Sequence, residues 1–267
     1  MSILLAEVVP EGIIFGADRN VSWSREEVLH GNVVIQNLGH TQRSKVLRWP
    51  QRKALIGYVG AAQVGGVPTD EWLYDFIGRY NTFERLETLA EALRAEIEAQ
   101  RRIDERTNSP EALILHLGGF ELVEGICKPF IWFVRNAYGM DDRGNYTDIR
   151  REFQKSEEFW LYFPDTAPER IGILLGELAC QFNPFWFHHG FDLGTFNTIE
   201  GFLKRAFKAL CDSSPAHSLP LTLSAWESQV RMSILTYGAY FQAYRGPSEQ
   251  FVGGGADIVS IPWPRTA

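Results

Sequence analysis

The sequence has 267 residues, of which 45% are hydrophobic and 22% charged, and its formal net charge at pH 7 is −7. These values are ordinary for a globular protein, and the length suits one α+β domain, spanning residues 1–267, with a substantial core. The acidic balance argues against a nucleic-acid partner and against an anionic membrane surface, because both favour clustered Lys and Arg.

Cysteine content and the N-terminal sequence indicate a compartment. The odd number and wide spacing of Cys127, Cys180 and Cys211 predict neither a disulfide framework nor a CxxC metal site. The first apolar run is interrupted by Glu7 and Pro10 and has no basic region, so we expect no secretory signal. No stretch approaches the ~18 apolar residues of a membrane span. We therefore expect a cytoplasmic protein with no membrane partner.

The first sixty residues are predicted to be mostly β-strand. Residues 2–9 and 12–17 are short runs rich in Ile, Leu and Val, and the Pro-Glu-Gly turn between them predicts a β-hairpin. We expect further strands at residues 31–37, 45–49 and 54–60.

The apolar period then changes to that of a helix. Helices are predicted to begin at Thr69 and to run over residues 82–106, where the charged face of the second helix is expected to be solvated. Strands are expected at residues 112–117, 130–135 and 158–163.

The C-terminal part alternates less regularly. We predict helix over 166–182, a strand at 185–188, helices over 198–210 and 222–244, and a final strand at 256–261. Strands and helices fall in separate blocks, which favours α+β layers over alternating βαβ units.

Several of these motifs together resemble the proteasome β-subunit branch of the N-terminal nucleophile hydrolases. The resemblance is carried by the hairpin that ends at Asp18, the Lys45-Val46 step, the small-residue turn at 59–62 and the closing segment 253–261. It follows the element order over nearly the whole chain and is strongest at the two ends.

The resemblance implies a four-layer αββα sandwich, with two antiparallel sheets between helix layers, and a mature N-terminal nucleophile. With Met1 removed, the family nucleophile falls on Ser2, its aspartate on Asp18, its lysine on Lys45 and its oxyanion-hole glycine on Gly60. The implied activity is cleavage of peptide or amide bonds through an acyl-enzyme on Ser2. We expect no cofactor and no metal.

The chemistry needs these residue types. An N-terminal amine has a pKa of about 7.7–8.0, so the amine of Ser2 can take the proton of its own hydroxyl. A lysine beside it would lower the pKa of that amine, because like charges repel. Asp18 would orient Lys45, and a backbone N–H at Gly60 would stabilise the tetrahedral oxyanion.

The family also implies rings or stacked homo-oligomers, served in some members by a separate ATPase. The chain departs from the family pattern at Ser2, where threonine is usual, and over the long segment 20–44. Residues 189–192 replace a Gly-Ser-Gly turn, and Glu249 and Val252 replace an auxiliary Asp and Ser. A catalytically inactive structural or binding subunit and a small-molecule amidase therefore remain alternatives.

Other candidate sites are weaker. His188 and His189 are adjacent on a predicted strand, so they should point to opposite faces and not chelate one metal. Gly253–Gly255 precede a strand, which argues against a phosphate-binding loop. Ser224 and Ser228 lie on a predicted helix without a nucleophile elbow. Neighbouring aromatic residues are expected in the core: Phe182, Phe185, Trp186 and Phe187.

Overall fold

The computed structural model describes ten stretches of the chain: residues 2–29, 32–49, 54–80, 85–100, 111–141, 146–181, 183–190, 193–213, 222–244 and 252–264. Within them, the side chains of residues 22–29, 32–40, 140, 193 and 211 are not described.

The strands are β1 (Ile3–Val9), β2 (Gly12–Asp18), β3 (Asn20–Leu29), β4 (Asn32–Gln42), β5 (Val46–Trp49), β6 (Ala54–Gly60), β7 (Gln63–Val64), β8 (Val67–Pro68), β9 (Leu113–Val123), β10 (Ile126–Met140), β11 (Tyr146–Glu157), β12 (Phe185–Gly190) and β13 (Ala256–Pro262). The helices are α1 (Thr69–Arg79), α2 (Leu86–Gln100), α3 (Ile171–Cys180), α4 (Leu193–Ser213) and α5 (Leu223–Tyr244), with short 3-10 turns η2 (Trp160–Tyr162) and η3 (Pro168–Arg170).

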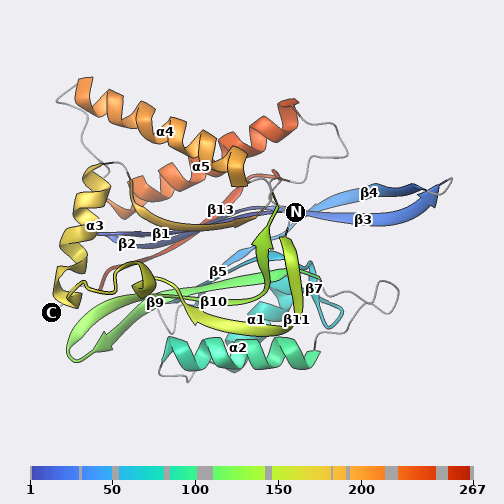
Figure 1. The fold of residues 1–267 in the computed structure, drawn as a ribbon, viewed down its shortest axis with the longest axis horizontal. Coiled ribbons are helices and arrows are strands. Elements are labelled where there is room, and N and C mark those ends of the chain that lie inside the picture. The colour runs from blue at the N-terminus through green and yellow to red at the C-terminus, as the bar shows by residue number, and fades with distance from the viewer. Residues whose placement is uncertain are drawn as a thin grey trace.

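Two antiparallel sheets form the centre of the molecule. One has the strand order β12-β1-β2-β13 and the other the order β11-β10-β9-β6-β5. Helices α4 and α5 lie over the outer face of the four-stranded sheet, and α1 and α2 lie over the outer face of the five-stranded sheet (Figure 1). The expected mixture of helix and strand is present. None of the helices in the described ranges is long and apolar enough to cross a bilayer.

The central hairpin is buried on both faces. On β1, Ile3 and Leu5 pack with the α5 side chains, whereas Leu4 and Ala6 pack against the other sheet. Successive residues of a strand point to opposite faces, so a continuous apolar run is what such a position requires. This explains why residues 2–9 and 12–17 were predictable from sequence.

Phe15 sets how closely the two sheets approach. Its ring lies over two glycines of the five-stranded sheet, Gly57 on β6 and Gly118 on β9. A Cβ atom at Gly118 would lie 2.8 Å from Cζ of Phe15, and one at Gly57 would lie 3.3 Å from its Cδ2. Side chains at either position would therefore push the sheets apart.

The predicted strand at 158–163 is wrong. Residues Trp160–Tyr162 form the 3-10 turn η2 instead. The carboxylate of Glu157 accepts hydrogen bonds from the amides of Phe159 (3.0 Å) and Trp160 (2.9 Å), which turns the chain at this point. Phe159 is fully buried. This segment therefore contributes aromatic packing to the core, although its residues favour a strand.

Four strands were not predicted: β3, β11 and the two-residue strands β7 and β8. β11 is an edge strand on which only Phe153 is buried, so its sequence is too polar to show an apolar alternation. β3 pairs with β4 in an antiparallel hairpin that projects from the body (Figure 1) and accounts for most of the long 20–44 segment. Helix α4 also begins earlier than expected. Residues 101–106 of the predicted second helix lie outside the described residues.

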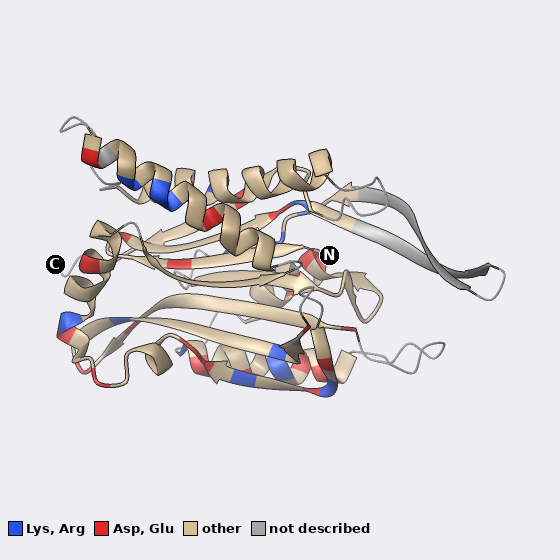
Figure 2. Ribbon diagram, turned by 45° about the horizontal axis from the view of Figure 1, so that its top comes forward, with Lys and Arg blue, Asp and Glu red and all other residues tan. Residues whose placement is uncertain are grey.

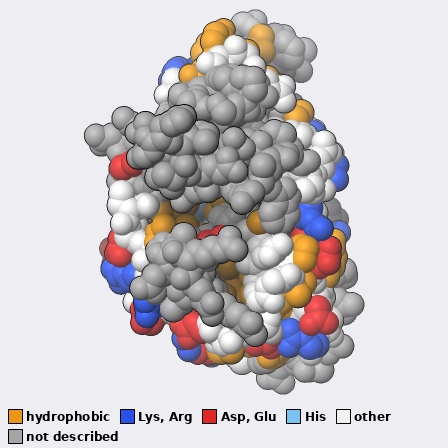
Figure 3. All heavy atoms as spheres, turned by 90° about the vertical axis from the view of Figure 1, so that its right-hand side faces the viewer, with side chains coloured by type: hydrophobic (Ala, Val, Ile, Leu, Met, Phe, Trp, Pro, Cys, Tyr) orange, Lys and Arg blue, Asp and Glu red, His pale blue; other side chains and the backbone are white. Residues whose placement is uncertain are grey.

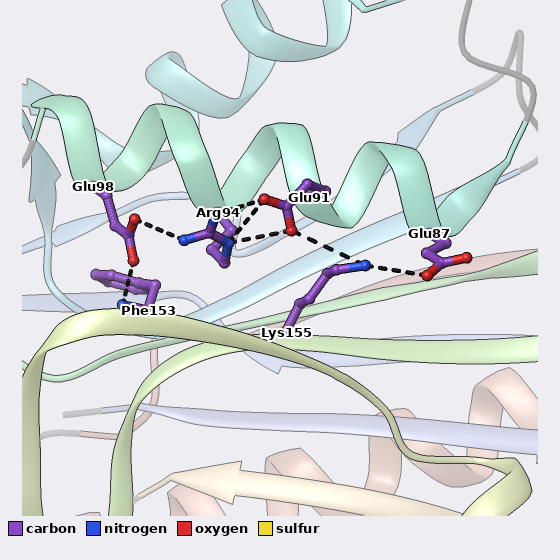
Figure 4. Close-up of polar contacts among 6 residues, drawn as sticks. All are labelled: Glu87, Glu91, Arg94, Glu98, Phe153 and Lys155. Atoms are coloured by element: carbon purple, nitrogen blue, oxygen red, sulfur yellow. Dashed lines mark hydrogen bonds and ion pairs between the residues drawn. The ribbon is translucent and has the colours of Figure 1, made fainter.

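Ion pairs fix the edge strand β11 to α2 (Figure 4). Glu98 accepts two hydrogen bonds, one from the amide of Phe153 (2.7 Å) and one from Nη1 of Arg94 (2.7 Å). Lys155 lies between two glutamates of α2, with its Nζ 3.2 Å from Oε1 of Glu87. Charged residues are frequent on the helices and on β11 and sparse on the inner strands of the two sheets (Figure 2).

Glu98 should contribute more to stability than the other members of this network. We expect Glu98→Ala to lower the free energy of unfolding by about 1–2 kcal/mol, because a backbone amide loses a charged acceptor. Glu87→Ala should cost about 0–1 kcal/mol, since it removes only a partly exposed ion pair. Urea unfolding would measure both. Glu98→Gln keeps an acceptor for the Phe153 amide, so a loss as large as that of Glu98→Ala would contradict this assignment.

Candidate active site

A buried ion pair joins the two sheets. Nζ of Lys45, immediately before β5, lies 3.0 Å from Oδ1 of Asp18, the last residue of β2. The two side chains are 1% and 0% exposed. An ion pair taken out of water is tolerated only when its remaining hydrogen-bonding groups are satisfied.

Asp18 meets this condition with backbone donors. Its Oδ1 also accepts the amide of Ile3 (2.9 Å), and its Oδ2 accepts the amides of Asn20 (3.2 Å) and Gly253 (3.4 Å). The carboxylate therefore connects the first residues of β1, the end of β2 and the segment that precedes β13.

Burial lowers the pKa of Lys45 from its ordinary value, and the nearby charge of Asp18 opposes this shift. Asp257 acts in the same direction as Asp18, more weakly. Nζ also donates a hydrogen bond to the carbonyl of Asn20. The ammonium is thus oriented by a carboxylate and a carbonyl, in a setting that makes it easier to deprotonate than an exposed lysine.

Ser2 lies next to this pair through the backbone. It precedes Ile3, whose amide bonds the same Asp18 oxygen as Lys45, and it is 6% exposed. Gly190 on β12 pairs with Ile3 and has φ +153°, and a Cβ atom there would lie 2.3 Å from the carbonyl oxygen of Ser2. Only glycine allows β12 to approach the start of β1 this closely.

Gly60 lies at the same edge of the molecule. The amide of Tyr58 donates to the carbonyl of Lys45 (2.9 Å), which places the end of β6 beside Lys45. Gly60 follows two residues later, is exposed and has φ +109°. Its conformation directs a Cβ position to within 2.1 Å of the Ala112 carbonyl oxygen, so a side chain is excluded. The surface seen in Figure 3 is hollowed near its centre, and hydrophobic side chains line part of the hollow.

The structure thus brings Asp18 and Lys45 into contact, places Ser2 one residue from a shared hydrogen bond, and leaves Gly60 at the same edge without a direct contact to them among the described residues. Two participants were missed from sequence, Asn20 and Gly253.

The run of three glycines is the signal that could have found them. Gly253, Gly254 and Gly255 all have positive φ, at +149°, +70° and +100°. The carbonyl of Gly253 accepts the amide of Arg19 (3.1 Å), and a Cβ at Gly254 would lie 2.2 Å from Oδ1 of Asn20. Consecutive glycines before a strand therefore mark a close approach to the end of β2 and not a phosphate loop.

The two adjacent histidines point to opposite faces, as expected. Nδ1 of His189 lies 2.7 Å from Nε2 of His116 on β9, between the sheets, while His188 stacks on Trp186 toward α4. Burial is the first cause that lowers the pKa of His189 to about 3. Among the described residues, no group of three or more His, Cys, Asp or Glu is placed to hold a metal.

The remaining positions singled out from the sequence lie either in the core or outside the described residues. Val252 is fully buried, and Phe185, Trp186 and Phe187 pack in or against the core. Four positions lie outside the described residues: Phe182, Phe191, Asp192 and Glu249.

No protein-family model matches the sequence, and no curated protein matches it. Among solved structures, the chain is similar to Anbu (ancestral beta-subunit) from Yersinia bercovieri, with 12% sequence identity and a TM-score of 0.41. The match covers 97% of this chain and 81% of that chain.

The buried pair can be tested through its energetics. Lys45→Met should lower the free energy of unfolding by about 3–5 kcal/mol, because it leaves the Asp18 carboxylate buried without a counter-charge. The double variant Asp18→Asn/Lys45→Met should lose less than Lys45→Met alone. Denaturant unfolding of the wild type, Lys45→Met, Asp18→Asn and the double variant gives the coupling free energy. Additive losses would show that the two side chains do not stabilise one another.

Proposed function

We propose that this protein is a proteasome-like hydrolase that cleaves peptide or amide bonds with an N-terminal serine, on a four-layer αββα sandwich. The observation that supports this most strongly is the sharing of one Asp18 oxygen by Nζ of Lys45 and the amide of Ile3. That arrangement supports a role for the buried Lys45 next to Ser2, the residue that would become N-terminal on removal of Met1.

The nucleophile would be Oγ of Ser2. Its proton passes to the free amine of Ser2 as Oγ bonds to the carbonyl carbon of the substrate. The positive charge of Lys45 disfavours protonation of that amine beforehand and stabilises the developing alkoxide. Asp18 keeps Lys45 in position and takes no proton itself.

The tetrahedral intermediate then collapses. The oxyanion is stabilised by a backbone N–H at Gly60, a contribution that is typically worth ~10²–10³ in rate. The C–N bond breaks as the amine of Ser2 returns its proton to the leaving nitrogen, which leaves an ester on Oγ. Water hydrolyses this ester, releases the acid and restores the hydroxyl.

The proposal includes assembly. A homo-oligomeric ring or stack would be consistent with the family that the sequence resembles, and a separate ATPase would be its natural partner for folded substrates. Light scattering on the purified protein at micromolar concentration checks this part, and a monomer would contradict it.

One observation favours a second candidate, a non-catalytic subunit with the same fold. Ser2 is only 6% exposed, so little of its surface is open to a substrate. A small-molecule amidase is the third candidate, since a small substrate needs less access than a peptide chain.

The decisive experiment concerns the N-terminus. We expect the intact mass to show loss of Met1 and a β-lactone probe to add one equivalent of mass on Ser2. Ser2→Ala should lose Met1 equally well but take up no probe, because only the hydroxyl is missing. Ser228→Ala, on a hydroxyl that donates to the Ser224 carbonyl in α5, is the matched control and should label normally. Retained Met1, or labelling that survives Ser2→Ala, would rule out this mechanism.

Placement of Ser2 by β12 gives an independent prediction. Gly190→Ala should reduce the labelling rate at least tenfold, since a side chain there overlaps the Ser2 carbonyl and the backbone angle is strained. Gly125→Ala is the control, because it also has positive φ, at +81°, but nothing lies within 4 Å of its Cβ position. Equal labelling rates in the two folded variants would show that β12 does not position the nucleophile.

A further inference from the structure

A second buried charged cluster lies on the opposite face of β1. Glu7 follows Ile3 and Leu5 at the same strand period, so its side chain points toward the helices and not toward the other sheet. Glu200 and Lys204 lie one turn apart on α4. The side chains of Glu7 and Glu200 are 0% and 1% exposed.

These carboxylates have few partners. Oε1 of Glu200 lies 3.4 Å from Nζ of Lys204, and beyond this ion pair no hydrogen bond reaches the four carboxylate oxygens from the described residues. Nζ of Lys204 lies 4.4 Å from the centre of the Trp186 ring, so this side chain of α4 packs against β12.

Among the described residues, the other groups that contact this cluster carry no charge near pH 7. His188 on β12 stacks on Trp186, and burial, with the charge of Lys204, lowers its pKa to about 4, so it is neutral near pH 7. On the other side of β1, Glu7 is paired with Ile14 of β2. The charge under α4 is therefore set by Glu7, Glu200 and Lys204.

The charges of Glu7, Glu200 and Lys204 balance only if one carboxylate is protonated. With both carboxylates ionised, the cluster carries one uncompensated negative charge, which is costly away from water. With one carboxyl group protonated, Lys204 balances the charge of the other. The protonated carboxyl can then donate a hydrogen bond to an oxygen of the remaining carboxylate.

We propose that Glu7 and Glu200 share one proton beneath α4, and that α4 stays docked on the four-stranded sheet only while this proton is held. The device is a pH-dependent clamp on the helix layer that covers β1. It concerns the docking of α4 and does not depend on the proposed hydrolase activity.

The titration of Glu7 agrees with the geometry. Burial, followed by the charge of Glu200, raises the pKa of Glu7 from 4.5 to about 8, while Lys204 opposes the shift. Burial also raises the pKa of Glu200. A carboxyl whose pKa is raised on folding stabilises the folded state at low pH, and this stabilisation is lost as the pH rises through about 8.

Hydrogen exchange of the intact protein tests the clamp. Exchange of α4 amides, followed at pH 5.5, 6.5 and 7.5 and corrected for the intrinsic rate, gives the opening equilibrium. If opening releases one proton, the opening constant rises about tenfold per pH unit. Glu7→Gln and Glu200→Gln should each remove this slope, because one neutral amide leaves a balanced pair with Lys204.

The control is Glu177→Gln, at an exposed position on α3, which should keep the wild-type slope. Infrared difference spectra between pH 6 and pH 9 should show a protonated carboxyl in the wild type that is absent from Glu7→Gln. Equal slopes in the wild type and Glu7→Gln, or no protonated carboxyl at pH 6, would overturn the proposal.

Discussion

The buried ion pair between Asp18 and Lys45 is the constraint on which the rest of the molecule depends. A carboxylate with no access to water needs donors on both oxygens, and the chain supplies three backbone amides in addition to Lys45. Those amides come from the start of β1, the first residue of β3 and the glycine segment before β13. Each of these segments must therefore be in place before the pair is stable, and the pair in turn fixes them relative to β5.

Packing enforces the same arrangement away from the site. Phe15 lies over Gly57 and Gly118, so the two sheets approach closely where its ring fits. On the outer face of the four-stranded sheet, α5 is equally close, since a Cβ at Gly16 would lie 2.5 Å from Cγ1 of Val230. β2 is thus held from both sides, and the position of Asp18 at its end follows from this.

Sequence alone predicted the parts of the molecule whose local pattern and environment agree. β1 and β2 are buried on both faces and have the apolar runs that such strands need. The contact between Asp18 and Lys45 was implied only by the family resemblance, through the role of orienting lysine that it assigns to Asp18. Prediction from sequence failed where tertiary contacts override the local preference for strand or helix. Residues 158–163 have strong strand propensity but are turned by the Glu157 carboxylate, whereas β11 is polar because an edge strand needs little apolar surface. Asn20 and Gly253 act through backbone amides, which no side-chain motif reveals.

The hydrogen bond from the amide of Gly253 to Asp18 spans 235 positions of the sequence. Both outer strands of the four-stranded sheet, β12 and β13, also come from the C-terminal third of the chain. A polypeptide emerges from the ribosome N-terminal end first. β1 and β2 are therefore synthesised well before β12 and β13, the strands that pair with them. The surroundings of Asp18 are consequently completed only after the segments that contain β12, Gly253 and β13 have been synthesised.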